Sequence, residues 1–197
     1  DMDRLARSIE GINLKIAFAF LLSMPGAPFI YYGDEIGMRF NPTLSKDGGY
    51  NRTGARTPMQ WSTEENAGFS TADANALYLP VNDDYTSRST EVQESDEESI
   101  LNTVKRLLKL RKSYPQLGSR ARLKVISRTY PLVLKLSGEE SDIFALINPS
   151  AEEHSVTLTG AKILESNNVA RVGDTFTLGA ESFAWIEADK DAQAVYK

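Results

Sequence analysis

The sequence predicts an α/β segment followed by an all-β domain. Residues 13–24 and 28–32 are apolar and are separated by a Pro-Gly break, which is typical of a buried helix followed by a buried strand. After Gly118, apolar and polar residues alternate in several short stretches, which is typical of antiparallel strands. The first pattern is one helix–strand step of a barrel or a doubly wound sheet. The second is a small antiparallel sandwich or barrel.

The composition excludes several classes of function. Of the 197 residues, 41% are hydrophobic and 25% are charged, which are ordinary values for a globular protein. The net charge of −5 argues against a nucleic-acid partner. The chain has no cysteine and a single histidine, His154, so we expect neither a disulfide framework nor a zinc site, and no metal or cofactor.

The apolar stretches are too short and too broken for a membrane span. The longest, residues 16–30, is interrupted by Ser23, Pro25, Gly26 and Pro28. The first residues carry neither an initiator Met nor a signal-peptide pattern, so we expect the chain to start within a longer sequence. A cytoplasmic and a periplasmic or secreted location both stay open.

The α/β segment opens with a helix expected over residues 13–24. Asn13 is its expected N-cap, and Pro25-Gly26 ends it. The strand expected over residues 28–32 leads into Gly33, Asp34 and Glu35. Carboxylates at the C-terminal edge of a buried strand are the layout of an active-site rim in a parallel α/β barrel. An exposed turn would have the same layout.

Residues 37–94 show no long periodic segment and are expected to form an irregular but ordered loop, because aromatic residues recur along them. A helix is expected over residues 99–112, with a capping box formed by Ser95 and Glu98. Pro115 and Gly118 close this helix.

The all-β segment consists of the stretches "ARLKVISR", "LVLKLSG", "DIFALIN", "HSVTLTG", "TFTLG" and "SFAWIEA". We place the domain boundary near residues 117–120, with an α/β domain over 1–118 and a β-sandwich over 119–197. The side chains predicted to face its core include Leu123, Val125, Leu132, Leu134, Phe144, Leu146, Val156, Leu158, Phe183 and Trp185.

Two motifs in this order resemble the alpha-amylase superfamily, glycoside hydrolase family 13. They are "PGAPFIYYGDEIGM" and "GARTPMQWSTEENAGFS", and they are similar to the alpha-glucosidase, oligo-1,6-glucosidase and trehalose synthase branches. The resemblance implies that residues 1–118 are the last segment of a catalytic (β/α)8 TIM barrel: seventh helix, eighth strand, long eighth loop and eighth helix. It implies that residues 119–197 are an antiparallel β-sandwich C-terminal domain.

The resemblance also implies roles for individual residues. "DMDR" matches the end of the family's Asn-His-Asp motif, so Asp1 takes the position of a catalytic aspartate and Arg4 that of a substrate-binding arginine. The nucleophile and the general acid of the family lie upstream and are not assigned here. A solvated terminal residue is the plainer interpretation of Asp1, and a surface helix residue that of Arg4.

The remaining candidates lie in the two motifs. Asp34 and Glu35 are interpreted as structural acids of the loop start. Arg56, Gln60 and Trp61 either line outer sugar subsites or hold the long loop in place.

The resemblance implies a C-terminal fragment of a retaining alpha-glucan-active enzyme, an exo-acting alpha-glucosidase, whose partner is an alpha-linked gluco-oligosaccharide. The alternatives are a trehalose synthase and a non-catalytic structural or carbohydrate-binding module. We expect the fragment alone to be inactive and to self-associate through exposed barrel faces, because a single barrel strand cannot close an eight-stranded sheet.

Overall fold

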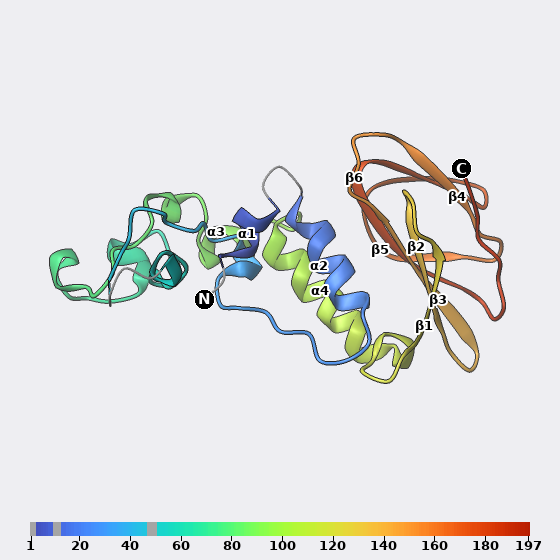
Figure 1. Cartoon of the computed structure of the whole chain (residues 1–197), viewed down its shortest axis with the longest axis horizontal. Helices are drawn as coiled ribbons and strands as arrows, with labels where there is room; N and C mark the ends of the chain where they lie inside the picture. Colours follow the sequence, from blue (N-terminus) through green and yellow to red (C-terminus); the bar gives the residue numbers. More distant parts are fainter. Residues whose placement is uncertain (1–2, 10–12, 47–50) are drawn as a thin grey trace. The chain divides into compact units, whose positions relative to one another are not determined.

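The computed structural model describes residues 3–9, 13–46 and 51–197. The chain forms two compact units. The first, here called the loop unit, comprises Asp1–Leu14 and Ile30–Thr103, and the second, the sheet unit, comprises Lys15–Phe29 and Val104–Lys197. Helices and irregular turns occupy the first half of the chain, and strands the second (Figure 1).

The helix predicted over residues 13–24 is confirmed as α2, Leu14–Ser23. Arg111, on α4 (Ile100–Ser113), caps its C-terminal end. The Arg111 guanidinium donates to the carbonyls of Leu22 (2.6 Å), Met24 (2.9 Å) and Gly26 (2.7 Å). A cation at these otherwise unpaired carbonyls also complements the helix dipole. Burial lowers the pKa of Arg111. Within the described ranges, no helix is both long and apolar enough for a membrane span.

The prediction of a strand over residues 28–32 is wrong for this chain. These residues pair with no strand in the portion of the chain that the structure describes, and Phe29 is 91% exposed. A barrel strand obtains its ladder hydrogen bonds from parallel neighbours, whereas every strand pair in the described residues is antiparallel.

The loop unit is irregular but ordered, as predicted. It contains short elements separated by turns: α1 (Leu5–Ser8), η1 (Asp34–Ile36), η2 (Asn51–Ala55), η3 (Glu65–Gly68), η4 (Ala74–Ala76), η5 (Asp83–Thr86) and α3 (Thr90–Glu94). Its buried apolar cluster is small and comprises Ile36, Met38, Met59 and Leu101. Short elements around a small core leave many backbone groups that need side-chain partners.

The helix predicted over residues 99–112 is confirmed as α4, but the capping box is wrong. Ser99 caps this helix, because its Oγ accepts from the Asn102 N–H at 3.1 Å. Ser95 instead closes α3, where its hydroxyl donates to the Val92 carbonyl at 2.7 Å. After α4, the predicted stop at Pro115 is confirmed by the turn η6 (Pro115–Leu117).

The sheet unit contains one curled antiparallel sheet (Figure 1). Its strands follow the order β1-β2-β3-β6-β4-β7, and β5 pairs with β6. The long strand β6 pairs with β3 through its second half and with β4 through its first half. The strands are β1 (Arg122–Ser127), β2 (Leu132–Ser137), β3 (Ser141–Asn148), β4 (His154–Thr157), β5 (Lys162–Val172), β6 (Thr175–Asp189) and β7 (Val195–Tyr196).

The structure corrects the predicted strands in two places. The stretches "TFTLG" and "SFAWIEA" form one strand, β6, which continues through Glu181 with a positive φ of 48°. The strand β5 was not predicted, since Glu165 to Asn168 interrupt the apolar alternation and Asn168 has a φ of 54°. The strands β5 and β6 pair with each other over most of their length, and this pairing contains two register shifts.

Both faces of the central strands β3 and β6 are buried. Phe144, Leu146 and Ile186 belong to the cluster on one face, and the alternating residues Ala145 and Trp185 are also fully buried. The predicted inward residue Val125 is 40% exposed, and its neighbour Ile126 packs against the core cluster instead, at a register shift in β1.

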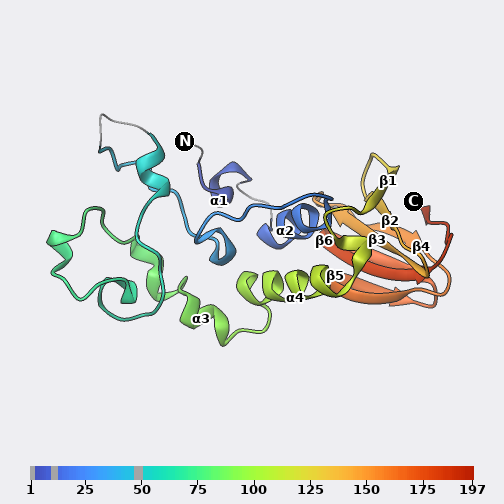
Figure 2. The same cartoon turned by 90° about the horizontal axis from the view of Figure 1, so that it is seen from below.

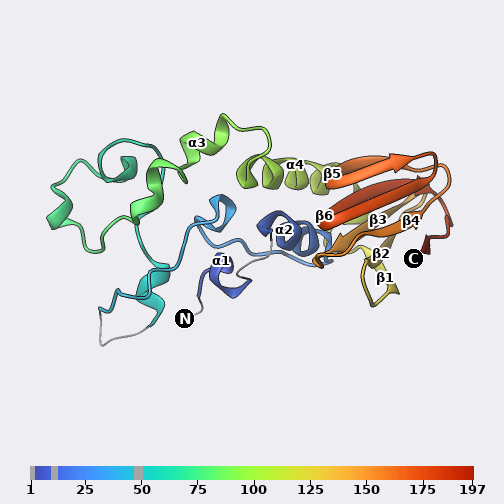
Figure 3. The same cartoon turned by 90° about the horizontal axis from the view of Figure 1, so that it is seen from above.

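Helix α4 lies beside β5 within the sheet unit, as both turned views show (Figures 2 and 3). An ion pair of 2.7 Å joins Arg106 on α4 to Glu165 on β5. Lys15 on α2 donates to the Asn167 amide oxygen at 3.4 Å. Polar contacts therefore join both helices to β5.

Candidate functional site

A tight turn follows Tyr32, where the sequence predicts the site. Gly33 and Gly37 have positive φ values of 84° and 68° and flank η1. A Cβ at Gly33 would lie 2.2 Å from Met38 Sδ and would displace that side chain, and the positive φ itself favours glycine here. The Met38 N–H donates to the Gly33 carbonyl at 2.8 Å and closes the turn. Asp34 and Glu35 thus begin a tightly closed turn.

Arg4 is buried against this turn, with 1% of its surface exposed, so the interpretation as a surface residue is wrong. Its Nη1 donates to the Tyr32 carbonyl and lies 3.4 Å from Asp34 Oδ1. Its guanidinium lies 4.8 Å from the Tyr32 ring centroid and 5.2 Å from that of Tyr31, within cation–π distance. Arg4 Nε and Nη2 are buried and have no hydrogen-bond partner among the described residues.

Burial controls the titration of this cluster. It raises the pKa of Tyr32 to about 12, an effect that Tyr31 reinforces and the Arg4 charge opposes. Burial also raises the pKa of Asp34, against the opposing attraction of Arg4. Tyr32 therefore stays neutral at neutral pH, and its hydroxyl donates to the Thr57 carbonyl at 2.9 Å. This bond connects the turn to the second motif.

A pocket of about 370 Å³ opens between the turn and the long loop. Its lining is mostly aromatic and aliphatic and carries one acid and one guanidinium: Tyr32, Glu35, Arg56, Pro58, Met59, Trp61, Phe69, Leu77, Tyr78 and Leu79. Trp61, Phe69 and Tyr78 are 52%, 49% and 60% exposed. The Glu35 Oε2 atom is buried and has no hydrogen-bond partner in the described residues.

The motif "GARTPMQW" splits into pocket residues and residues buried behind them. Arg56 and Trp61 line the pocket and are exposed, whereas Thr57 and Gln60 are buried. The Gln60 amide donates to Asp84 Oδ1 at 3.1 Å. Arg56 and Trp61 thus share one pocket, while the contact of Gln60 with Asp84 holds the loop. A sugar-binding role for these residues stays a prediction.

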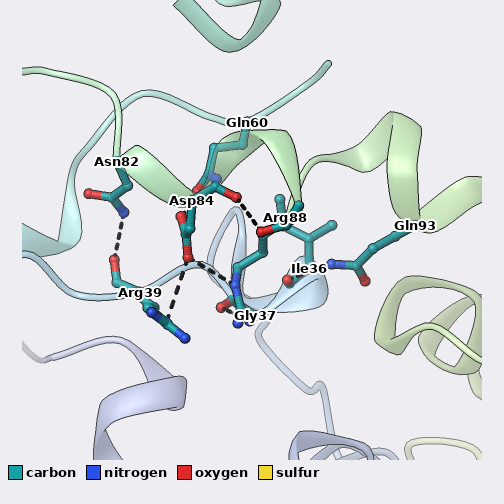
Figure 4. A network of polar contacts seen from close by, with 9 residues as sticks. Ile36, Gly37, Arg39, Gln60, Asn82, Asp84, Arg88 and Gln93 are labelled. Atoms are coloured by element: carbon teal, nitrogen blue, oxygen red, sulfur yellow. Dashed lines mark hydrogen bonds and ion pairs between the residues drawn. The ribbon is translucent and has the colours of Figure 1, made fainter. Parts of the chain in front are cut away.

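A polar network around Asp84 fastens the loop (Figure 4). Arg88 Nε lies 3.0 Å from Asp84 Oδ2, and its Nη1 donates to the Gly37 carbonyl at 2.9 Å. The Arg39 Nε lies 3.6 Å from the same carboxylate oxygen. These contacts join the first motif to the distant η5 segment.

The buried side chain of Gln93 also joins two distant segments of the loop unit by hydrogen bonds (Figure 4). Its amide donates to the Ile36 carbonyl at 2.7 Å, and its Oε1 accepts from the Leu101 N–H at 3.1 Å. One side chain therefore connects the turn after Gly33 to the start of α4.

Two sequence-based expectations bear on the rest of the site. Asp1, the predicted catalytic aspartate, lies outside the described residues. Across residues 3–9, 13–46 and 51–197, acidic and histidine side chains form no group of three that could hold a metal ion. The pocket residues Phe69, Leu77 and Tyr78 were not predicted from the sequence. Their only signal was the recurrence of aromatic residues in the loop.

Comparison with known proteins identifies the family. The model of the alpha-amylase catalytic domain matches residues 1–119. A trehalose synthase/amylase of Mycobacterium tuberculosis is 36% identical over 144 residues, which cover 69% of this chain and 23% of the relative. An alpha-glucosidase of Culex pipiens is 31% identical over 160 residues, covering 80% of this chain and 27% of the relative.

Among solved structures, a mutant of the trehalulose synthase MutB with its substrate sucrose has a TM-score of 0.80. It is 22% identical and covers 95% of this chain and 41% of MutB, so the likeness concerns the fold. The chain thus spans about a quarter of the length of the curated relatives described above. The chain belongs to the alpha-amylase family, glycoside hydrolase family 13.

Proposed function

We propose that the whole protein to which this chain belongs isomerises a short alpha-glucoside with retention, as a trehalose synthase. The observation that carries the proposal is the 36% identity to the trehalose synthase/amylase of Mycobacterium tuberculosis. The aromatic pocket with Glu35 and Arg56 supports a saccharide substrate, because aromatic faces and charged hydrogen-bonding groups suit sugar rings and hydroxyls.

Retention requires two carboxyl groups about 5–5.5 Å apart, one as nucleophile and one as acid and base. These two groups belong to the upstream segment of the family's barrel. This chain would contribute Asp1, whose carboxylate would accept hydrogen bonds from sugar hydroxyls and favour the distorted transition state. It would also contribute Arg56 with Trp61 at outer subsites, whereas Arg4, which is 1% exposed and paired with Asp34, would act at the innermost sugar through the turn that it holds. Gln60 supports these subsites from behind through Asp84.

An exo-acting alpha-glucosidase is the second candidate, and the 31% identity to the Culex pipiens enzyme favours it. Both reactions share the covalent glucosyl-enzyme intermediate. When water attacks the anomeric carbon, the carboxylate leaves and free glucose forms. When a hydroxyl of the retained glucose attacks instead, trehalose forms and no water is consumed.

Product analysis of the full-length protein on maltose separates the candidates. Trehalose without net release of glucose is the expected result. Glucose as the main product would favour the hydrolase, and absence of both products would overturn the proposal. Variants Asp1→Asn and Arg4→Lys test the assigned residues, since each should reduce turnover while thermal melting confirms that the protein remains folded.

We propose further that residues 119–197 form a separate, non-catalytic β-sandwich domain that follows the barrel segment, residues 1–118, in the sequence. The curled antiparallel sheet supports this assignment. Deletion of residues 119–197 should lower the stability of the full-length protein and leave the chemistry of its products unchanged. A change from trehalose to another product would contradict the assignment.

A further inference from the structure

We propose that Asp84 is a positioning residue of the active site and that its contacts set the ratio between isomerisation and hydrolysis. The inference rests on the proposed function for the reaction itself. Asp84 lies outside both sequence motifs and does not line the pocket. It would therefore act on the substrate only through the residues that it holds.

The first argument is the enclosure of the Asp84 carboxylate among donors. The side chain is 19% exposed, although Asp84 lies in the short turn η5. Its Oδ1 accepts from the Gln60 amide at 3.1 Å, and its Oδ2 accepts from Arg88 Nε at 3.0 Å (Figure 4). Arg88 is only 26% exposed, so this ion pair is shielded from solvent and is stronger than a pair on the open surface.

The second argument is the set of segments that Asp84 connects. Gln60 belongs to the second motif. Arg88 extends the connection to the first motif, because its Nη1 donates to the Gly37 carbonyl at 2.9 Å. A Cβ at Gly37 would lie 2.9 Å from Arg88 Nη1, so glycine at this position permits the approach. One carboxylate therefore joins both motifs to η5, although the three segments are distant in the sequence.

The third argument is that the residue held by Asp84 is the direct neighbour of a pocket residue. Gln60 precedes Trp61, which lines the pocket. The backbone of these two residues is held by the start of α3: the Thr90 N–H donates to the Gln60 carbonyl at 2.9 Å, and the Glu91 N–H donates to the Trp61 carbonyl at 3.0 Å. The segment from η5 to α3 thus fixes Trp61 through backbone bonds at one end and through Asp84 at the other.

A displaced Trp61 should change the fate of the glucose at the outer subsite. In the proposed isomerisation, a hydroxyl oxygen of this glucose bonds to the anomeric carbon, the enzyme carboxylate leaves, and the hydroxyl proton passes to the general base. This step needs an aligned hydroxyl, and a misplacement of about 1 Å can cost about 10²-fold in rate. Water attacks the same carbon without being aligned by the outer subsite. Loss of the Asp84 contacts should therefore slow isomerisation more than hydrolysis.

Hydrogen exchange of the full-length protein tests whether Asp84 holds this segment. In Asp84→Ala, the Thr90 and Glu91 amides should exchange about tenfold faster, because loss of a charge-assisted contact shifts a local opening equilibrium by about this factor. Asp83→Ala is the matched control, since Asp83 is the exposed neighbouring acid, and should leave the exchange unchanged. The amides of β3 should keep their protection in both variants, which shows that the opening is local.

Product analysis on maltose tests the consequence for the reaction. The ratio of glucose to trehalose should rise about tenfold in Asp84→Ala and stay unchanged in Asp83→Ala. Asp84→Asn keeps an acceptor for Gln60 but loses the charge that attracts Arg88, so its ratio should lie between these two. A variant that is merely less stable contains less active protein, which lowers both products equally and leaves the ratio unchanged.

Arg88→Gln is a second test that applies even where Asp84→Ala does not fold. This variant keeps the bond between Asp84 and Gln60 but removes the guanidinium that donates to the Gly37 carbonyl. It should raise the ratio of glucose to trehalose in the same direction. Circular dichroism melts check that each variant is folded.

Two results would overturn the inference: unchanged exchange of the Thr90 and Glu91 amides in Asp84→Ala, or an unchanged product ratio in both Asp84→Ala and Arg88→Gln. The proposed function fails by a different result, since it is removed when the unsubstituted protein makes no trehalose. A protein that makes trehalose at the same ratio with and without Asp84 would remove this inference alone.

Discussion

The two units of this chain are stabilised in different ways. In the sheet unit, the central strands bury apolar residues on both faces, and Phe144, Phe176 and Trp185 are fully inaccessible. In the loop unit, the apolar cluster around Ile36 and Met38 is small. Burial of apolar surface therefore dominates one unit, whereas specific side-chain hydrogen bonds to the backbone contribute to the other, in which Arg4 and Glu35 nevertheless have buried polar atoms without a partner among the described residues.

The buried polar residues of the loop unit illustrate the difference. Gln93 bonds two backbone groups that lie far apart in the sequence, and Asp84 receives hydrogen bonds from Gln60 and Arg88. An irregular loop has no repeating ladder, so each buried backbone group needs a specific partner. Substitutions should consequently act through cavities in the sheet unit and through orphaned hydrogen-bonding groups in the loop unit.

The largest effect is expected for Phe144→Ala in the sheet core. The substitution removes a fully buried ring and should lower the free energy of unfolding of the sheet unit by about 3–5 kcal/mol. Urea denaturation followed by circular dichroism measures it. Val172→Ala is the control, since Val172 is 81% exposed and its loss should change stability by less than about 0.5 kcal/mol. Equal effects of both variants would contradict the role assigned to the core.

Gln93→Leu tests the polar fastening of the loop unit. Leucine has a similar size but leaves the Ile36 carbonyl and the Leu101 N–H without their partner, at a cost of about 1–3 kcal/mol for each unsatisfied group. Trp61 fluorescence during denaturation reports on this unit. Glu65→Gln, at an exposed position of the same unit, serves as the control. A stable Gln93→Leu variant would show that apolar packing also holds the loop unit.

Arg111→Leu tests whether the sheet unit depends on a polar contact as well. The variant leaves the carbonyls of Leu22, Met24 and Gly26 without a donor and should destabilise α2 by about 1–3 kcal/mol. Hydrogen exchange of the α2 amides measures local opening. Lys112→Leu changes an exposed charge one residue further on and should have little effect. Equal protection of α2 in both variants would argue against the cap.

A lower pH should change the stability of the two units in opposite directions, and by less than the substitutions above. Burial acts to raise the pKa of Asp142, but hydrogen bonds from Lys135 and from the Asp191 and Gly138 amides outweigh it, and the pKa falls below its ordinary value of 3.8. Ionised Asp142 therefore stabilises the folded sheet unit at pH values above the pKa of the unfolded state. This stabilisation is lost as the pH falls through the pKa of the folded state. Asp142→Asn should remove this component of the acid dependence, as measured by urea denaturation at a series of pH values.

For Asp34 the sign is reversed. Burial raises its pKa above 3.8 in the folded loop unit, so the folded state binds the proton more tightly than the unfolded state. Its contribution favours folding below the unfolded pKa and decreases as the pH rises through the folded pKa. Asp34→Asn should therefore weaken the pH dependence of the free energy of unfolding between these two pKa values. Denaturation followed by Trp61 fluorescence measures it. A steeper dependence would contradict the assigned direction.

Local patterns predicted much of the fold. The helices α2 and α4 follow from apolar spacing and from Pro and Gly stops, and strands β2 and β3 follow from alternation. The strand over residues 28–32 could not be decided in this way. Its apolar side chains suit a buried strand, but a strand also needs neighbours, and the described chain supplies none there.

For the candidate site, too, local patterns predicted some residues and missed others. The motifs identified Arg56 and Trp61, which both line the pocket, and placed Asp34 and Glu35 at a turn. Neither spacing nor residue type indicated that Gln60 is directed to Asp84, or that Phe69 and Tyr78 share a wall with Glu35. Those contacts join residues that are distant along the loop.

The sequence by itself determined the family, the helices and the antiparallel character of the C-terminal segment, because these depend on residue types at short, regular spacing. Only the tertiary structure decided that Arg4 is buried against the Tyr31–Tyr32 turn, that β5 is a strand, and that Glu35 lines an aromatic pocket while its buried Oε2 has no partner among the described residues. The physical reason is that burial, long-range pairing and desolvation are properties of residues brought together by folding, which no local pattern encodes.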